Sequence, residues 1–426
     1  MDTAGKSIKK PELLCPAGSL EVLKTAVRFG ADAVYIGGDA FGLRAKAQNF
    51  HPEEMAEGIA YAHAHGAKVH VTANILAHER DMEGAAAYFR ELEAMRPDAV
   101  LIADPGMFAL ARENCPSVPI HISTQANNTN AGTFRFWYEQ GAARVVCARE
   151  LSLEEIREIR QKTPPGLEIE AFVHGAMCIS YSGRCLLSSY FTGRDANHGE
   201  CTHPCRWKYA VVEETRPGEY LPVEENERGT YVFNSKDLCM IEHIPELCEA
   251  GIDSLKIEGR MKTALYVATV ARTYRRAIDD WAQDPEKYRE NLPWYREEIR
   301  KCTYRQFTEG FYFGRPDAAS MVYDSNTYIN ESVYYGTVED VCGPEDVPGG
   351  GDAGSFSVIT QKNKFLSGEE LEIMKPDGRN VRTRVREIRS GEGERMDSAP
   401  HPKQKLFVRL DPAPEAGDLL RSTASD

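Results

Sequence analysis

The stretch Gly30-Ala-Asp-Ala-Val34 joins the end of a predicted helix to the start of a predicted strand, and it decides the fold class because the chain repeats it. The same lead-in returns as Gly141-Ala-Ala-Arg-Val145 and as Gly251-Ile-Asp-Ser-Leu255. A glycine that ends a helix and passes the chain to a buried strand explains the recurrence. The first 260 residues are therefore predicted to repeat one unit, a short apolar strand followed by a turn and an amphipathic helix.

Eight strands of this kind are expected, and most are apolar, as strands buried on both faces of a parallel sheet should be. They are Glu12–Cys15, Ala33–Ile36, Lys68–Thr72, Ala99–Ala103, Pro119–Ser123, Arg144–Cys147, Glu168–Val173 and Ser254–Ile257. The helical segments between them include Leu20–Phe29, Glu53–His65, Thr133–Gln140 and Leu153–Lys162. This alternation predicts an α/β fold, a complete or distorted (βα)8 barrel, with a doubly wound open sheet as the alternative that spacing alone does not exclude.

The chain is expected to divide into a barrel-like domain over residues 11–280, a helical connection over 281–333 and a small all-β barrel over 334–422. A helix over Thr263–Asp280 should close the first domain. The third has the alternating pattern of strands, with Gly343–Gly354 as a loop and the last residues frayed. Its predicted strands are Ser355–Thr360, Glu370–Met374, Asn380–Ile388 and Lys405–Leu410.

The chain has 426 residues, more than one hydrophobic core usually serves. Its formal net charge of −14 argues against a surface that binds nucleic acid everywhere, although a local basic groove would still attract phosphates. The first ten residues lack the apolar core of a signal peptide, and no run of about eighteen apolar residues is present. We therefore expect a cytoplasmic protein without a membrane partner.

Four cysteines gather in a long excursion, at about residues 175–230, that leaves the carboxyl end of the seventh strand, where barrels place their active sites. Cys178, Cys185, Cys201 and Cys205 have the spacing Cys-x6-Cys, fifteen residues, then Cys-x3-Cys. In a reducing cytosol such a group favours a metal site over disulfides. Four thiolates hold either zinc or an iron–sulfur cluster, and the x6 spacing is long for a zinc knuckle, which favours the cluster. Cys239 is an alternative fourth ligand.

Polar side chains follow the ends of several predicted strands, where they could bind a small anion or hydrogen-bond one another to close the barrel. These candidates are Asn74, Gln125, Arg149, His174 and Arg260. We predict that His174 and Arg260 are catalytic, that the other three bind substrate, and that Glu258 pairs with Arg260.

Arg184 and Arg206 are each next to a predicted ligand cysteine. They are expected to bind substrate and to keep positive charge near the metal, or else to form surface salt bridges.

The cysteine stretch is part of a longer motif. Glu170-x-Phe172-x2-Gly175-Ala-Met-Cys178-x4-Gly183-x-Cys185-x-Leu187-Ser188 resembles the signature of the U-32, or collagenase-like, peptidase family. Further matches are Glu12-Leu-Leu-Cys-Pro-Ala-Gly18, Gly30-Ala-Asp-Ala-Val-Tyr-Ile-Gly37, Asn234-Ser-Lys-Asp-Leu238 and Ser254-Leu-Lys-Ile-Glu-Gly-Arg260. The resemblance runs from about Pro11 to Ile278, and the β segment is similar to that of the longer members.

Despite the family's name, the resemblance implies oxygen-independent hydroxylation with a four-iron, four-sulfur (4Fe-4S) cluster on cysteines of this motif. Members act on quinone precursors, on ribosomal RNA or on the wobble uridine of tRNA. The segment Cys201-x3-Cys205-Arg-Trp207 and the β extension favour the last group, which makes 5-hydroxyuridine with prephenate as co-substrate. The expected partners are the anticodon region of tRNA, prephenate, and either an electron donor or a paralogue.

A peptidase or a zinc-stabilised binding module is the alternative from another class. The chain has no His-Glu-x2-His motif and no Gly-x-Ser-x-Gly elbow, so a peptidase would need a papain-like pair such as Cys15 and His174.

Two basic stretches and two aromatic residues are candidates for RNA contact. Arginines on one predicted strand face or on one helix could bind phosphates, and an aromatic ring could stack on a splayed base. They are Arg382, Arg384 and Arg386 on the strand, Arg272, Arg275 and Arg276 on the helix, and the rings of Tyr190 and Trp207.

Overall fold

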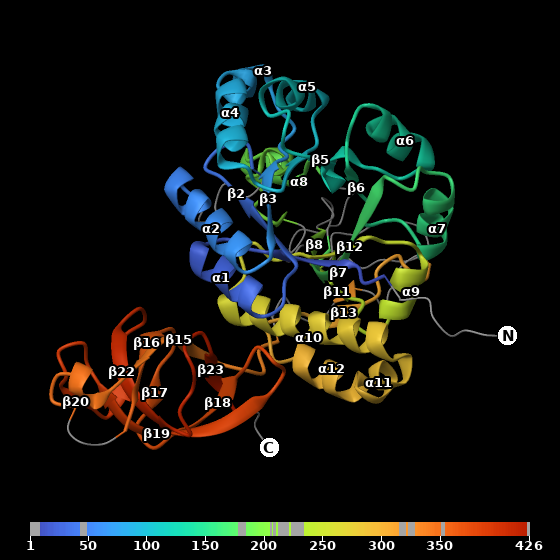
Figure 1. Ribbon diagram of the computed structural model, residues 1–426. Coiled ribbons are helices and arrows are strands. Elements are labelled where there is room, and N and C mark those ends of the chain that lie inside the picture. The colour runs from blue at the N-terminus through green and yellow to red at the C-terminus, as the bar shows by residue number, and fades with distance from the viewer. Residues whose placement is uncertain are drawn as a thin grey trace.

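The structure is a computed structural model, in which a barrel domain lies beside a smaller β domain (Figure 1). It describes residues 9–42, 49–177, 185–204, 207, 210–211, 221–222, 234–314, 321–322, 329–350 and 354–423. None of the described helices is both long and apolar enough to cross a membrane.

Eight parallel strands form the first domain, and they close into a barrel. They are β1 (Glu12–Pro16), β2 (Ala33–Gly37), β3 (Lys68–Ala73), β4 (Ala99–Ile102), β5 (Ile120–Ile122), β6 (Arg144–Val146), β7 (Glu168–Ala176) and β12 (Ser254–Ile257). Ser254 of β12 pairs with Glu12 of β1 on one side and with Glu170 of β7 on the other. This closure confirms the predicted barrel and excludes the open sheet.

Helices cover the outside of the barrel (Figure 1). They are α1 (Leu20–Arg28), α2 (Pro52–Ala64), α3 (Glu79–Met82), α4 (Ala85–Met95), α5 (Pro105–Asn114), α6 (Ala131–Glu139), α7 (Leu153–Gln161), α9 (Ile244–Glu249) and α10 (Ala264–Gln283). Their apolar faces share one core with the outward strand residues, such as Leu13 and Val34, which are fully buried. Each side chain of that size contributes roughly 1.5–3 kcal/mol on burial. Polar side chains start the helices: Ser152 and Glu155, for example, form a capping box on α7.

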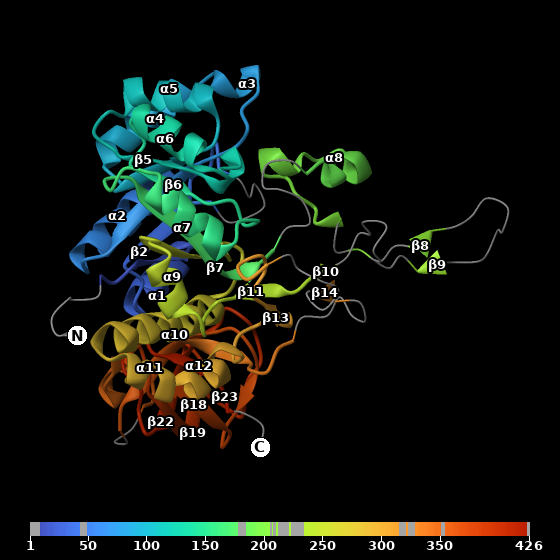
Figure 2. The same ribbon diagram turned by 90° about the vertical axis from the view of Figure 1, so that its right-hand side faces the viewer.

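The excursion after β7 begins later than expected, because β7 continues to Ala176 and pairs there with the antiparallel strand β11 (Asp237–Cys239). β11 in turn pairs with β13 (Phe307–Thr308). Between β7 and β11 lies α8 (Leu187–Thr192), which Figure 2 shows beyond the barrel on the side where β7 ends. The other short strands here are β8 (Ala210–Val211), β9 (Leu221–Pro222), β10 (Asn234–Ser235) and β14 (Met321–Val322).

The second domain is a closed antiparallel β barrel, as predicted. The strand order is β18-β23-β15-β16-β22-β19-β20, and β18 also pairs with β19. The main strands are β15 (Tyr334–Cys342), β16 (Phe356–Gln361), β18 (Glu370–Met374), β19 (Asn380–Arg389), β20 (Arg395–Met396), β22 (Lys405–Asp411) and β23 (Leu419–Ser422); β17 (Phe365–Leu366) and β21 (Ser398–Ala399) form a separate pair. β23, which was not among the predicted strands, lies between β15 and β18, and Leu419 and Leu420 are fully buried, so tertiary pairing orders it.

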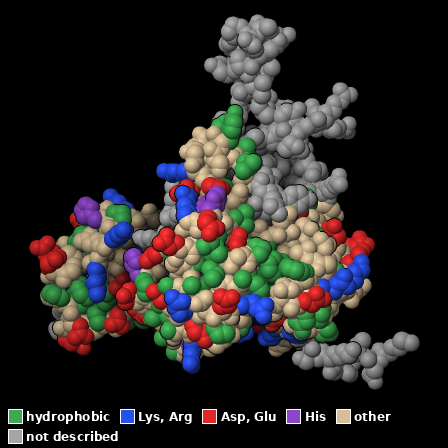
Figure 3. Space-filling model, turned by 90° about the horizontal axis from the view of Figure 1, so that it is seen from above, with side chains coloured by type: hydrophobic (Ala, Val, Ile, Leu, Met, Phe, Trp, Pro, Cys, Tyr) green, Lys and Arg blue, Asp and Glu red, His purple; other side chains and the backbone are tan. Residues whose placement is uncertain are grey.

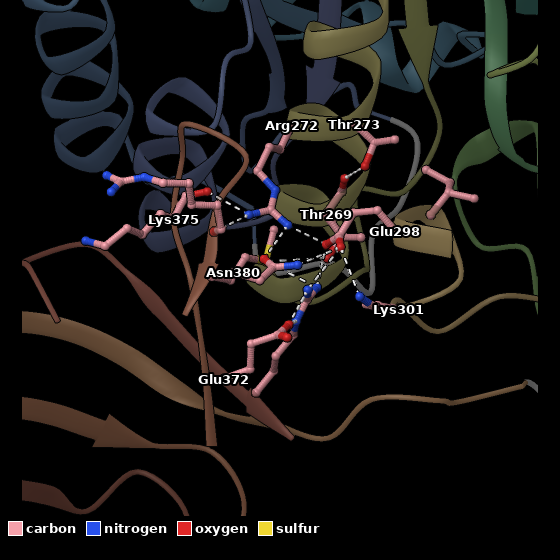
Figure 4. Close-up of polar contacts among 12 residues, drawn as sticks. Thr269, Arg272, Thr273, Glu298, Lys301, Glu372, Lys375 and Asn380 are labelled. Atoms are coloured by element: carbon pink, nitrogen blue, oxygen red, sulfur yellow. Dashed lines mark hydrogen bonds and ion pairs between the residues drawn. The ribbon is translucent and has the colours of Figure 1, made fainter. Parts of the chain in front are cut away.

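The two domains are joined by α10, by α11 (Pro285–Glu290) and α12 (Leu292–Ile299), and by a buried polar cluster that Figure 4 shows. Arg272 of α10 lies in this cluster, where it donates to the carbonyl oxygen of Lys375 at 2.7 Å and pairs with Glu298. Its side chain is only 1% exposed, so the prediction that Arg272 contacts RNA was wrong: this helix face packs against the β domain.

Candidate active site at the mouth of the barrel

Arg260 crosses the mouth of the barrel. It follows β12, is 5% exposed, and donates to Oγ1 of Thr72 on β3 at 2.7 Å. Glycines make room for it: a Cβ on Gly37 would lie 2.5 Å from Nη1 of Arg260, and one on Gly18 would lie 2.1 Å from its carbonyl oxygen. The guanidinium is therefore fixed by shape as well as by hydrogen bonds, which is how an anion-binding group is preorganised.

Arg149, after β6, is the second arginine at the mouth. It forms an ion pair with Glu258 at 2.8 Å, and its guanidinium lies over the ring of Phe172, 3.8 Å from the centroid. The sequence suggested Arg260 as the partner of Glu258, and this ion pair instead joins Glu258 to Arg149. The loop after β12 thus contacts Arg149 through Glu258 and β3 through Arg260.

Two further predicted residues lie at neighbouring strand ends. Nδ2 of Asn74, after β3, donates to Oγ of Ser123, after β5, at 3.0 Å. Gln125 is half-buried, and its Oε1 has no hydrogen-bond partner within the part of the chain that the structure describes. An amide oxygen of this kind can accept a hydrogen bond from a substrate N–H.

His174 lies on the helix side of β7. Its ring packs against Tyr266 and Tyr274 of α10 and against Phe307, with centroids 5.6–6.0 Å apart. Burial lowers the pKa of His174 to about 3, so the ring is neutral at physiological pH. Its catalytic role stays a prediction.

The cysteine-bearing excursion is docked over the end of β3. Nδ2 of Asn197 donates to the carbonyl oxygen of Cys185 at 3.1 Å, and the N–H of Leu76 donates to the carbonyl oxygen of Asn197 at 3.2 Å. His198 contacts Asp81 at 2.9 Å from the same side. Cys185 is therefore held at the mouth of the barrel.

Cys201 has surroundings that suit a thiolate ligand. Its Sγ accepts a hydrogen bond from the backbone N–H of His203 at 3.4 Å, because His203 has a left-handed backbone with φ of 56°. Such N–H···S bonds tune cysteine-bound clusters. The other two predicted ligands, Cys178 and Cys205, and the neighbouring Arg184 and Arg206 lie outside the described residues, and among the residues that are described no group of three His, Cys, Asp or Glu could hold a metal ion.

Cys239 lies in different surroundings. Cys239 of β11 lies opposite His174 of β7 in the strand pairing. Its sulfur accepts a hydrogen bond from Oη of Tyr274 at 4.0 Å. Burial raises the pKa of its thiol to about 12. It also borders a cavity of about 350 Å³ that Arg296 and Glu242 line. Cys239 therefore lies near α10 and α12, whereas Cys185 is linked through Asn197 to the loop after β3. The two cysteines have separate surroundings.

The barrel interior holds a charged network that the sequence did not lead us to expect. Arg144 of β6 pairs with Glu12 at 2.6 Å, Glu168 at 2.7 Å and Glu170 at 2.9 Å. Lys256 of β12 pairs with the other oxygen of Glu170 at 2.7 Å. The signal in the sequence was a charge at alternate positions of otherwise apolar strands, which places those charges on the inner face.

Two histidines share this interior. His70 of β3 and His121 of β5 meet edge to face, with ring centroids 4.9 Å apart. Burial lowers the pKa of His70 to about 4 and also lowers that of His121, where the positive charge of Arg144 adds to the effect. The pair is therefore neutral and adds no positive charge to the network at physiological pH.

Fold and site together define an α/β-barrel protein whose cysteine-bearing excursion and two fixed arginines meet at one mouth. The sequence profile of peptidase family U32 matches residues 18–322, and that of the U32 C-terminal domain matches residues 348–421. The chain belongs to the U32 family.

Three similar relatives have named activities. The chain is 40% identical to tRNA hydroxylation protein P1 of Bacillus subtilis, over 97% of this chain and 95% of that protein. It is 38% identical to tRNA hydroxylation protein P of Escherichia coli, over 92% of each. It is 37% identical to the 23S rRNA 5-hydroxycytidine C2501 synthase of E. coli, over 63% of this chain and 39% of that protein.

Proposed function

We propose that this chain hydroxylates the wobble uridine of tRNA to 5-hydroxyuridine in the cytoplasm, without dioxygen and with prephenate as co-substrate. The observation that carries the proposal is the similarity to tRNA hydroxylation proteins along almost the whole chain, through barrel, excursion and β domain. The match to the ribosomal RNA enzyme covers much less of both chains. The names of these relatives support hydroxylation of RNA. That the base is uridine, that prephenate is the co-substrate and that a cluster takes part are our proposals.

Cys178, Cys185, Cys201 and Cys205 are the proposed ligands of a 4Fe-4S cluster, with zinc as the alternative. Two observations support this set: Cys185 is docked at the barrel mouth, and Cys201 accepts a backbone hydrogen bond at its sulfur. Cys239 contacts Tyr274 of α10 and has different neighbours from Cys185, which favours Cys205 over Cys239 as the fourth ligand. When bound, a cluster would transfer electrons at the mouth. A partner protein would exchange electrons with it.

Arg260 and Arg149 are the residues that would bind the two carboxylates of prephenate, since guanidinium groups match carboxylates in geometry and charge. Arg260 is fixed by Thr72 and by the space at Gly37. Asn74 and Gln125 would orient the uracil ring, with Oε1 of Gln125 accepting a hydrogen bond from its N–H. Arg184 and Arg206 would hold positive charge beside the ligands.

His174 is the candidate proton acceptor, and both its low pKa and its position on the helix side of β7 make it a weak one. The rings of Tyr190 and Trp207, 83% and 44% exposed, would stack on unpaired bases of the anticodon loop.

Peptidase activity is disfavoured by the state of the thiol in the papain-like pair. Burial raises the pKa of Cys15 well above its usual range, and an undissociated buried thiol is a poor nucleophile.

Nucleoside analysis of a deletion strain tests the proposal. Total tRNA should lose 5-hydroxyuridine and its derivatives, while ribosomal RNA and quinones stay unchanged. The wild-type gene and a Cys239→Ala variant should restore the nucleoside, and Cys201→Ala should not. If hydroxylation is lost only from ribosomal RNA or from quinones, the chain acts on that substrate instead. Unchanged levels of 5-hydroxyuridine and its derivatives in tRNA would refute the proposal.

A further inference from the structure

A local surplus of positive charge on the β domain lies around one carboxylate, that of Glu387 on β19. Three arginines converge on it: Arg389 at 2.6 Å, Arg395 at 3.0 Å and Arg409 at 3.2 Å. Since one negative charge meets three positive ones, the group carries a net charge of about +2 on a chain whose total is −14.

The three arginines divide into a support and two outward groups. Arg389 is 7% exposed, contacts Glu387 through both Nε and Nη2, and donates Nη1 to the carbonyl oxygen of Gly393 at 3.0 Å. Arg389 thus neutralises the charge of Glu387 from the buried side of the group. Arg395 and Arg409 are 74% and 31% exposed, and each is tied to Glu387 by one nitrogen. Nε of Arg409 has no hydrogen-bond partner among the described residues.

Two of the three arginines predicted from the strand pattern differ in this respect, and the third, Arg382, is exposed on the same strand. Arg384 and Arg386 are exposed on one face of β19, as expected, but each has its own acid: Glu370 at 2.7 Å and Asp411 at 2.8 Å. Elsewhere the described surface also mixes the two signs, as on the face in Figure 3. Because each of these two arginines is paired with one carboxylate, the pairs present little net positive charge to a phosphate.

We propose that Arg395 and Arg409, held by Glu387 and backed by Arg389, bind backbone phosphates of the substrate RNA. Lys405 is exposed on the outward face of β22, two pleats from Arg409, and extends the same basic strip. The surface lies on the β domain, away from the catalytic mouth, so it would anchor the RNA without reading its sequence. The inference rests on the proposed function, because it takes the substrate to be an RNA.

The test is binding of an unmodified tRNA transcript to the full-length chain, measured by fluorescence anisotropy across salt concentrations. Arg395→Gln with Arg409→Gln should weaken binding about 10-fold and reduce the slope of log K against log salt by about 2, one for each phosphate that is no longer neutralised. The control pair, Arg384→Gln with Arg386→Gln, removes the same charge and should bind like wild type.

Thermal melting checks that each variant is folded. If the double variant is unstable, Arg395→Gln alone carries the test with a slope change of about 1, since that side chain is mostly exposed. Unchanged binding by the Arg395 and Arg409 variants, or an equal loss in the control pair, overturns the inference. Neither result affects the nucleoside analysis, which separates failure of this surface from failure of the proposed function.

Discussion

Glu298 of α12 and Arg421 of β23 are 123 residues apart in the chain and fully buried against each other, with Nη1–Oε1 at 2.7 Å and Nη2–Oε2 at 3.1 Å. Arg272 of α10 binds the same carboxylate, and Arg421 also pairs with Glu372 (Figure 4). Helices α10 and α12 are thereby joined to β23 of the second domain through one buried carboxylate.

Arg421→Met should destabilise this junction. Removing one partner of a buried pair leaves charge uncompensated, which costs about 3–5 kcal/mol of unfolding free energy. Arg384→Gln, which breaks an exposed pair with Glu370, is the control and should cost less than about 1 kcal/mol. Urea unfolding measures both, and equal stabilities of the two variants would contradict the central role of the cluster.

Glu12 in the barrel interior should make stability depend on acid pH. Burial alone would raise the pKa of Glu12, but the hydrogen bond and charge of Arg144 lower it from 4.5 to about 2. A lowered carboxyl pKa stabilises the fold above pH 4.5, and the contribution is lost as pH falls toward 2. Its size at neutral pH is about 3 kcal/mol.

Glu12→Gln should therefore be less stable than wild type at pH 7, and the gap should narrow steadily between pH 5 and pH 3. Chemical denaturation at several pH values checks it. A gap that is constant with pH would show that the carboxylate charge contributes nothing.

Gly37→Ala should reduce activity, because the new Cβ would lie 2.5 Å from Nη1 of Arg260 and push the guanidinium from Thr72. A displacement of about 1 Å at a positioned group costs up to about 100-fold in rate. Gly391→Ala is the matched control, since its Cβ would meet its nearest atom at 3.8 Å. Restored nucleoside levels in cells that carry Gly37→Ala would argue against a fixed Arg260.

Cys201→Ala should lose iron and acid-labile sulfide, whereas Cys239→Ala should keep both, because the two sulfurs have separate surroundings. Metal and sulfide analysis of anaerobically purified protein measures the difference. If the wild-type protein contains zinc and no sulfide, the metal is zinc and not a cluster. If only Cys239→Ala loses iron, Cys239 is a ligand.

The sequence by itself determined the order and position of the barrel strands. Runs such as Ala33–Ile36 are short, apolar and preceded by a helix-ending glycine, and these are local properties that do not depend on the rest of the chain. The same strand pattern placed the cysteine-bearing excursion after the seventh strand and Arg260 after the eighth, because both positions follow directly from the order of the strands along the chain.

Only the tertiary structure decided closure and burial. Whether β12 meets both β1 and β7 depends on contacts between segments about 240 residues apart in the chain, as for Glu12 and Ser254, and no local pattern reports them. Arg272 has the sequence of an exposed helix position and is buried, because Glu298 and the β domain compensate its charge. The identity of a side chain sets what it can bind; its neighbours across the fold set whether it is buried, charged and available.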